Sequence, residues 1–225
     1  MKEFLRKKNI IFSAKRYGID ALGAMAQGLF ASLLIGTIIS TLGEQLGIGI
    51  LVTVGGYAKG ATGAAMAISI GVALQCPPLV LFSLAAGMAA NELGGAGGPL
   101  AVLVVTIFAA EFGKLVSKET KIDIIVTPFV TICVGVLLSL GCAPAIGAAA
   151  STVGTAIMWA TELQPFFMGI IVSVIVGIAL TLPISSAAIC AALSLTGLAG
   201  GAAVAGCCAQ MVGFAVMSFK ENKWG

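Results

Sequence analysis

The feature that most constrains this chain is the length of its uncharged stretches. Between Asp20 and Glu111 only three residues carry charge, and between Asp123 and Lys220 only one does. Of the 225 residues, 59% are apolar and 9% are charged, whereas a soluble domain carries about 25% charged residues. So few charges cannot cover a soluble surface, and continuous apolar runs exclude the alternating pattern of a transmembrane β-barrel. The sequence therefore predicts an all-α, polytopic transmembrane helical bundle.

Proline and glycine divide the apolar sequence into eight or nine expected segments, some of them half-helices. Breaks are expected at 76–78, 91–99 and 141–144, because proline lacks a backbone donor and disfavours a helical residue before it. Broken helices near the midplane mark solute sites in transporters, although Gly and Pro are also common in ordinary membrane helices. The expected segments are 21–42, 57–75, 79–90, 99–116, 124–140, 146–161, 166–182, 187–198 and 201–219, with connections at 43–56 and 197–201.

Most charges fall in three clusters, at residues 2–20, 111–123 and 220–223. Lys and Arg concentrate on the cytoplasmic side of membrane proteins, so we expect all three clusters, including the N-terminus, to face the cytoplasm. Residues 1–19 are interpreted as a basic cytoplasmic segment, either an interfacial helix over 2–16 or an ordinary basic flank. Residues 20–219 form the transmembrane domain, and 220–225 form a short cytoplasmic tail.

Isolated polar residues in the apolar sequence supply the candidate solute site. Glu92 is the clearest, because an ionised group in the bilayer costs about 3 kcal/mol or more. Asn91 beside it and the glycines that follow add groups able to bind hydroxyls. The alternative is that Glu92 is a loop carboxylate at the outer surface.

Three further residues complete the candidate substrate-binding set. They are Glu162, Lys59 and Gln75. Glu162 lies near a tryptophan, which also fits a position at the membrane edge. Lys59 either pairs with an acidic residue, Glu44 or Glu92, or extends its ammonium group to the interface. Gln75 is expected to be a buried amide that needs a partner.

The chain carries no catalytic motif. It has no histidine, which excludes Ser–His and Cys–His pairs, and no phosphate-binding loop of the ATPase type. All six cysteines lie in apolar stretches without metal-ligand spacing, so we expect packing residues, no disulfide, no metal and no cofactor. No basic strip with interleaved aromatic residues suggests nucleic acid.

Two patterns at helical spacing predict contacts between side chains or helices. Glu111 and Lys114 lie one turn apart and are expected to form an ion pair at the inner membrane edge. Gly169, Ser173 and Gly177 form a stripe of small residues, which lets a neighbouring helix approach closely. The same stripe makes a homo-oligomer one possible use of this surface.

Four stretches of the chain resemble the phosphotransferase-system EIIC-like membrane protein family, which includes proteins named perfringolysin O regulator. The resemblance covers nearly the whole chain and is carried most specifically by residues 111–128, 158–169, 180–189 and 208–219. It implies a sugar-permease-like fold in a bacterial cell membrane. It further implies a subunit that translocates a sugar or similar polar solute and works with separate cytoplasmic EIIA- and EIIB-type proteins.

Two alternatives to a translocating subunit follow from the same residues. One is a non-transporting membrane sensor or regulator that has the EIIC-like fold, and the other is a carrier of an apolar ligand. Members of the family continue beyond residues 224–225 with further membrane segments, so we expect this chain to be a shortened form. Apart from membrane lipid and a polar solute, the expected partners are the cytoplasmic EIIA- and EIIB-type proteins.

Overall fold

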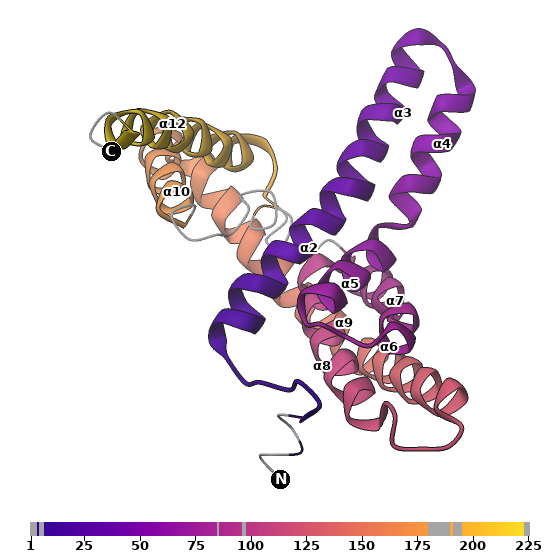
Figure 1. Ribbon diagram of the computed structural model, residues 1–225. Helices are drawn as coiled ribbons and strands as arrows, with labels where there is room; N and C mark the ends of the chain where they lie inside the picture. The colour runs from indigo at the N-terminus through magenta and orange to yellow at the C-terminus, as the bar shows by residue number, and fades with distance from the viewer. Residues whose placement is uncertain are drawn as a thin grey trace.

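The computed structural model describes residues 4, 7–84, 86–95, 98–179, 190 and 195–222, and all of its regular elements in these residues are helices. The all-α fold predicted from the uncharged stretches is therefore confirmed. Figure 1 shows a central group of helices around α5, α8 and α9, a hairpin of α3 and α4 that projects from it, and a separate C-terminal pair, α10 and α12.

The first long helix is made of four consecutive pieces. They are η1 (Lys15–Asp20), α2 (Ala21–Leu29), η2 (Phe30–Leu34) and α3 (Ile35–Leu46), in which the η pieces are π-helical. Together they form a 32-residue apolar helix, which exceeds the ~20 residues that cross a bilayer. The helix ends at Gly47, whose φ of 68° lies in the left-handed region that glycine adopts without strain.

The prediction that residues 43–56 form a connection between helices is wrong. After Gly47 the chain turns back into α4 (Gly49–Gly60), which packs along α3 (Figure 1). A Cβ atom on Gly55 would lie 2.3 Å from Ser40 Oγ. Gly43 and Gly55 thus serve close packing between the two helices, and Gly47 serves the turn.

The central bundle contains the break that the two adjacent prolines predict. Helix α5 (Thr62–Ala73) ends just before them, and α6 (Pro78–Ser83) begins at the second. The segment expected over 79–90 is divided between α6 and α7 (Ala86–Leu93), and α8 (Gly98–Val116) follows. The buried core lies between α2, α5, α8 and α9, and its fully buried members include Met25, Met66, Ile70, Leu74 and Val102.

The break expected at 141–144 is also wrong. Helix α9 (Asp123–Leu163) runs without interruption for 41 residues, with Pro128 and Pro144 inside it. A membrane helix tolerates proline when its neighbours hold it in place. Three residues after Pro144, Gly147 packs directly on the turn between α7 and α8, because a Cβ there would lie 2.1 Å from the carbonyl oxygen of Gly94.

The C-terminal pair consists of α10 (Pro165–Ala179) and α12 (Gly197–Asn222). The connection expected over 197–201 is wrong, since these residues form the first turn of α12, which begins at Gly197. The small-residue stripe on α10 does admit a neighbour, because a Cβ on Gly206 of α12 would lie 2.2 Å from the carbonyl oxygen of Ser173. Gly169 has open space beside it, so self-association through this residue stays a prediction. Most of the segment expected over 187–198 lies outside the described residues.

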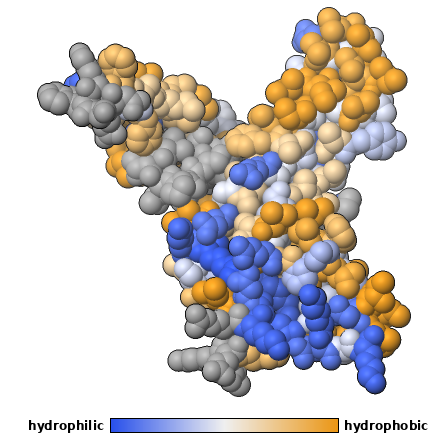
Figure 2. All heavy atoms as spheres, viewed as in Figure 1, coloured by the Kyte–Doolittle hydropathy of each residue, from blue (hydrophilic) through white to orange (hydrophobic). Residues whose placement is uncertain are grey.

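The outer surface of the described helices is apolar enough to contact lipid. Four helices of the described part are long and apolar enough to cross a membrane: Lys15–Leu46, Gly98–Val116, Asp123–Leu163 and Gly197–Lys220. Large apolar side chains cover much of the face shown in Figure 2, as on the α3–α4 hairpin. Hydroxyls in α9 donate to carbonyls one turn earlier, as Thr131 does to Thr127 at 2.8 Å and Thr161 does to Ile157 at 2.7 Å. Such bonds satisfy a hydroxyl without water, so the chain is a multi-pass membrane protein.

The contact between α9 and the turn after α7 can be tested with two glycines of the same helix. Gly147→Ala is expected to lower the unfolding temperature of the detergent-purified protein, because its Cβ has no room. Gly141→Ala is the matched control, since nothing lies within 4 Å of its Cβ and alanine favours a helix by about 1 kcal/mol. Equal melting temperatures for the two variants would contradict this packing.

Candidate functional site

The break between α5 and α6 leaves the backbone carbonyl of Leu74 without a helical backbone donor. A helical carbonyl is bonded by the amide four residues later, or three residues later in a tighter turn. For Leu74 those residues are Pro78 and Pro77, and neither has an N–H group. Gln75 turns away from the helix with a φ of 54°. The carbonyl of Leu74 must therefore find a donor elsewhere in the protein.

Two cationic side chains supply that donor. Arg16 donates from Nη2 to the Leu74 oxygen, and Lys114 donates to it from Nζ at 3.1 Å. Arg16 comes from the start of the first long helix, and Lys114 comes from the last turn of α8. Positive charge is favoured at this position also because the C-terminal end of α5 carries the negative end of its dipole. Three separate segments are thus held together at one oxygen atom.

The Lys114 charge is itself paired, although its side chain is only 1% exposed. Its Nζ donates to Glu111 Oε1 at 2.9 Å, which confirms the expected ion pair. The hydroxyl of Tyr17 donates to the same oxygen at 3.0 Å. Because a buried charge is tolerated only when it is paired and hydrogen-bonded, Glu111 and Tyr17 allow Lys114 to reach the Leu74 carbonyl.

An amide relay extends the cluster to the N-terminal segment. Arg16 Nη1 donates to Asn9 Oδ1 at 3.1 Å, and Asn9 Nδ2 donates to Gln75 Oε1 at 2.6 Å. Gln75, expected to be buried, is exposed, and its amide partner is Asn9.

The prediction of an interfacial helix over residues 2–16 is wrong for the described residues. Residues 10–13 are not helical, and Asn9 has a φ of 55°.

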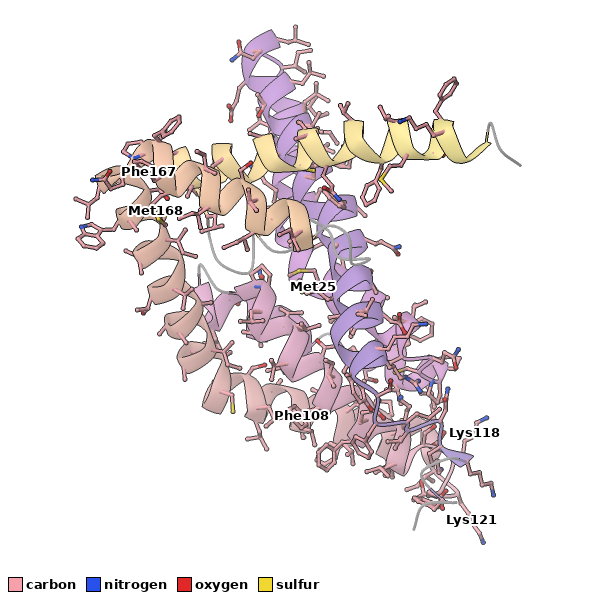
Figure 3. The ribbon with its side chains drawn as sticks, turned by 90° about the vertical axis from the view of Figure 1, so that its left-hand side faces the viewer. Met25, Phe108, Lys118, Lys121, Phe167 and Met168 are labelled. Carbon is pink, nitrogen blue, oxygen red and sulfur yellow. The ribbon has the colours of Figure 1, made fainter. Side chains whose placement is uncertain are left out.

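The N-terminal segment also contacts the loop after α8. Lys8 Nζ donates to the carbonyl oxygen of Ser117 and forms an ion pair with Glu119. Figure 3 shows Lys118 and Lys121 at this same end of the molecule, and Figure 2 shows hydrophilic residues gathered there. Two of the three charge clusters are therefore side by side, whereas the end of α12 lies well away from them in Figure 1.

Beside the break lies a pocket of about 440 Å³, which we call the N-terminal pocket. Polar and charged side chains from the N-terminal segment, the break and the loop after α8 dominate its wall. Its lining residues are Lys7, Lys8, Asn9, Gln75, Pro77, Lys114, Ser117, Lys118 and Glu119. The pocket offers amides, ammonium groups and one carboxylate, which suit a small polar ligand.

The thiol of Cys76, beside this cluster, is unreactive. Burial raises the pKa of Cys76 to about 11, although the nearby positive charges of Lys114 and Arg16 act in the opposite direction. At neutral pH the thiol is therefore protonated, and a protonated thiol is a poor nucleophile. This fits the packing role expected from the sequence; all six cysteines of the chain are free thiols.

The structure brings one of the five predicted site residues, Gln75, into the N-terminal pocket. Glu92 in α7, Lys59 in α4 and Glu162 in α9 are exposed, and none of their side chains makes a hydrogen bond or ion pair with another described residue. Asn91 packs against the start of α8, where its Oδ1 is 2.9 Å from the position of a Cβ on Gly98. The binding role of these four residues stays a prediction.

Sequence reasoning missed the central role of Arg16 and Asn9. No pattern links them to Leu74 or Gln75, which lie 58 and 66 residues further along the chain. One signal was present in the sequence. The two consecutive prolines lack both of the backbone N–H groups that could donate to the carbonyl of Leu74. That signal shows that a partner is needed, but it does not say which residue provides it.

The buried pair predicts a specific pattern of stability. Lys114→Ala should destabilise the protein by about 3 kcal/mol, because it leaves a buried carboxylate unpaired. The double variant Glu111→Gln/Lys114→Met should cost less, since it removes both charges. Thermal or denaturant unfolding in detergent checks the ranking. A double variant at least as unstable as Lys114→Ala would show that the pair is not coupled as described.

Comparison with known proteins identifies one family. Residues 19–225 match a family model described as phosphotransferase system, EIIC. No curated protein and no solved structure matches the chain.

Proposed function

Because this chain belongs to the phosphotransferase-system EIIC family, we propose that it binds a sugar or similar polar solute and translocates it across the membrane. The family supports a permease component, and the helices that are long and apolar enough to cross a membrane support its place in the bilayer. The chemical class of the solute is our proposal. It rests on the N-terminal pocket and its hydrogen-bonding groups.

The observation that carries the proposal is the polar pocket at a broken helix. Sugar hydroxyls both donate and accept hydrogen bonds, so a sugar site needs mixed donors and acceptors. The amides of Asn9 and Gln75 offer both, and Glu119 adds an acceptor. At about 440 Å³ the pocket lies within the ~300–1,000 Å³ usual for small-molecule sites.

The broken helix also suggests how the solute passes. Half-helices that meet at a solute site are typical of transporters, whose two sides open in turn. Here α5 and α6 meet at Gln75, and Arg16 and Lys114 hold the junction through side chains that can rearrange. We propose that solute binding at the Asn9–Gln75 pair loosens the contact between the N-terminal segment and the break.

We further propose that EIIA- or EIIB-type proteins act at the end of the molecule that carries the N-terminal pocket. The basic N-terminal segment and the loop after α8 lie together there. Positive charge of this kind marks the cytoplasmic side, which is where such partner proteins would be found. The proposed orientation therefore places the N-terminus and the pocket in the cytoplasm of a bacterial cell.

Uptake of labelled sugars into proteoliposomes tests the function. Gln75→Ala should reduce uptake about tenfold, the effect of losing one or two hydrogen bonds to the solute. Gln164→Ala is the matched control, because Gln164 is also exposed but lies at the junction of α9 and α10. Normal uptake by Gln75→Ala, or no uptake of any sugar by the unmodified chain, would contradict the proposal.

The same assay tests the other sequence-predicted residues. If Asn91 and Glu92 contact the solute further along its path, Glu92→Gln should also reduce uptake. Glu162→Gln and Lys59→Met address the remaining two positions. Full uptake by one of these variants would remove that residue from the proposed path and leave the N-terminal pocket as the solute site.

A further inference from the structure

A second hollow of the surface lies between the first long helix and α5, which pack side by side (Figure 1). Its volume is about 730 Å³, and η1, α2 and the last residues of α5 line it. We call it the α2–α5 groove. One end of the groove lies at the membrane edge, because Lys15 begins the apolar helix and Arg16 beside it bonds the Leu74 carbonyl just after α5 ends. The described lining residues of this groove and of the N-terminal pocket are different.

The π-helical turn at the start of the helix brings two opposite charges to the groove. Lys15 and Asp20 are five residues apart, which would separate their side chains by about 140° around an α-helix. In η1 the backbone bonds instead span five residues, as where the N–H of Ala21 donates to the carbonyl oxygen of Arg16. Residues five apart then stand one above the other. Lys15 and Asp20 therefore line the same groove.

The protein compensates neither of these charges. Lys15 and Asp20 are both exposed, and within the described ranges neither side chain has a hydrogen bond or ion pair. The neighbouring cation Lys114, by contrast, is paired with Glu111. A ligand that matches the groove must therefore bring one negative and one positive charge, about one helical turn apart.

The remainder of the groove suits the hydrophobic part of a lipid. Beyond Asp20 the first helix contributes Gly23 and Ala24, whose small size leaves room, and α5 contributes Val72, which is 60% exposed. Gln27 lies two turns deeper in the apolar helix, and its exposed amide can donate to an ester carbonyl. Charges at the membrane edge are thus followed by small apolar residues and one amide. The headgroup, esters and chains of a phospholipid have the same order.

We propose that the α2–α5 groove binds one molecule of phosphatidylethanolamine, with Lys15 at its phosphate and Asp20 at its ammonium group. This headgroup carries one charge of each sign, and its ammonium group, like that of lysine, has three N–H donors for the carboxylate. Phosphatidylglycerol has no cation for Asp20. Phosphatidylcholine has a cation but no N–H group to donate, so the pair of side chains selects the ethanolamine lipid.

Thermal unfolding of the full detergent-purified chain with added dioctanoyl phospholipids tests the site, since a bound ligand stabilises the folded state. The phosphatidylethanolamine should raise the unfolding temperature at a concentration at least about tenfold lower than the glycerol or choline lipid, because it alone forms both charge-assisted contacts. Asp20→Asn should remove the preference over phosphatidylglycerol, and Lys15→Met should weaken the response to all three lipids. Glu44→Ala/Lys121→Ala is the matched control, because it removes an exposed carboxylate and an exposed lysine that do not line the groove.

A count of bound lipid checks the site without relying on stability. Native mass spectrometry of the chain released from nanodiscs of equal phosphatidylethanolamine and phosphatidylglycerol should show one retained ethanolamine lipid. The Lys15→Met/Asp20→Asn variant should retain none, whereas the control variant should retain it. Equal retention of both lipids by the unmodified chain would contradict the assignment.

Other outcomes of the thermal assay would overturn the proposal. Equal stabilisation by the three lipids would show that the groove does not recognise the headgroup. A preference for phosphatidylglycerol would assign the groove to an anionic lipid. Stabilisation by soluble phosphoethanolamine at the same concentration as the lipid would assign it to a soluble zwitterion.

This lipid site lies apart from the proposed solute pocket, so the two are tested separately. Sugar uptake by a chain without any preference among the lipids would leave transport standing and remove the lipid site. Selective binding of phosphatidylethanolamine by a chain that takes up no sugar would leave the lipid site standing and remove the transport proposal.

Discussion

A single backbone oxygen organises the polar part of this membrane protein. Pro77 and Pro78 deprive the Leu74 carbonyl of both of its possible helical donors. In a low-dielectric surrounding an unpaired carbonyl costs several kcal/mol, so the fold must bring a donor to it. Arg16 and Lys114 do so, and the rest of the cluster follows from the need to accommodate two cations beside an apolar core.

The consequences extend from that oxygen to the surface. Lys114 can be buried only because Glu111 and Tyr17 compensate its charge. Arg16 orients Asn9, and Asn9 in turn bonds Gln75, which stands at the tip of the break. A structural requirement of the backbone thus generates a row of polar groups that ends at a pocket. Of the two cations that bond the Leu74 carbonyl, Lys114 also lines the pocket, together with the Asn9 and Gln75 amides that we propose contact the solute.

Much of the fold could be predicted from the sequence, and the errors share a physical cause. Uncharged runs long enough to cross a bilayer force helices, and two adjacent prolines force a break. A single proline such as Pro144 removes only one donor, so α9 continues where Gly147 packs against Gly94. Gly55 and Gly206 serve helix contacts. Sequence alone does not distinguish such a glycine from one in a turn.

The candidate site was predictable only in part, for a related reason. Glu111 and Lys114 lie on one helix face, so their spacing predicts their contact. The partners of Leu74 and Gln75 come from the far N-terminal segment and depend on how the helices pack. Isolated charges such as Glu92 were predicted as site residues because they interrupt apolar sequence. The structure instead assembles its polar groups around the Leu74 carbonyl, an uncharged backbone group that lacks a helical donor.

The most direct test of this account is the water accessibility of the break from each side of the membrane. In a chain whose six native cysteines are replaced, Gln75→Cys can be treated with a membrane-impermeant maleimide in vesicles of known orientation. Labelling from the side that carries a tagged N-terminus, and not from the other side, is the predicted result. A cysteine that is unreactive from both sides, or reactive only from the opposite side, would contradict a solute-accessible pocket at the Leu74–Pro78 junction.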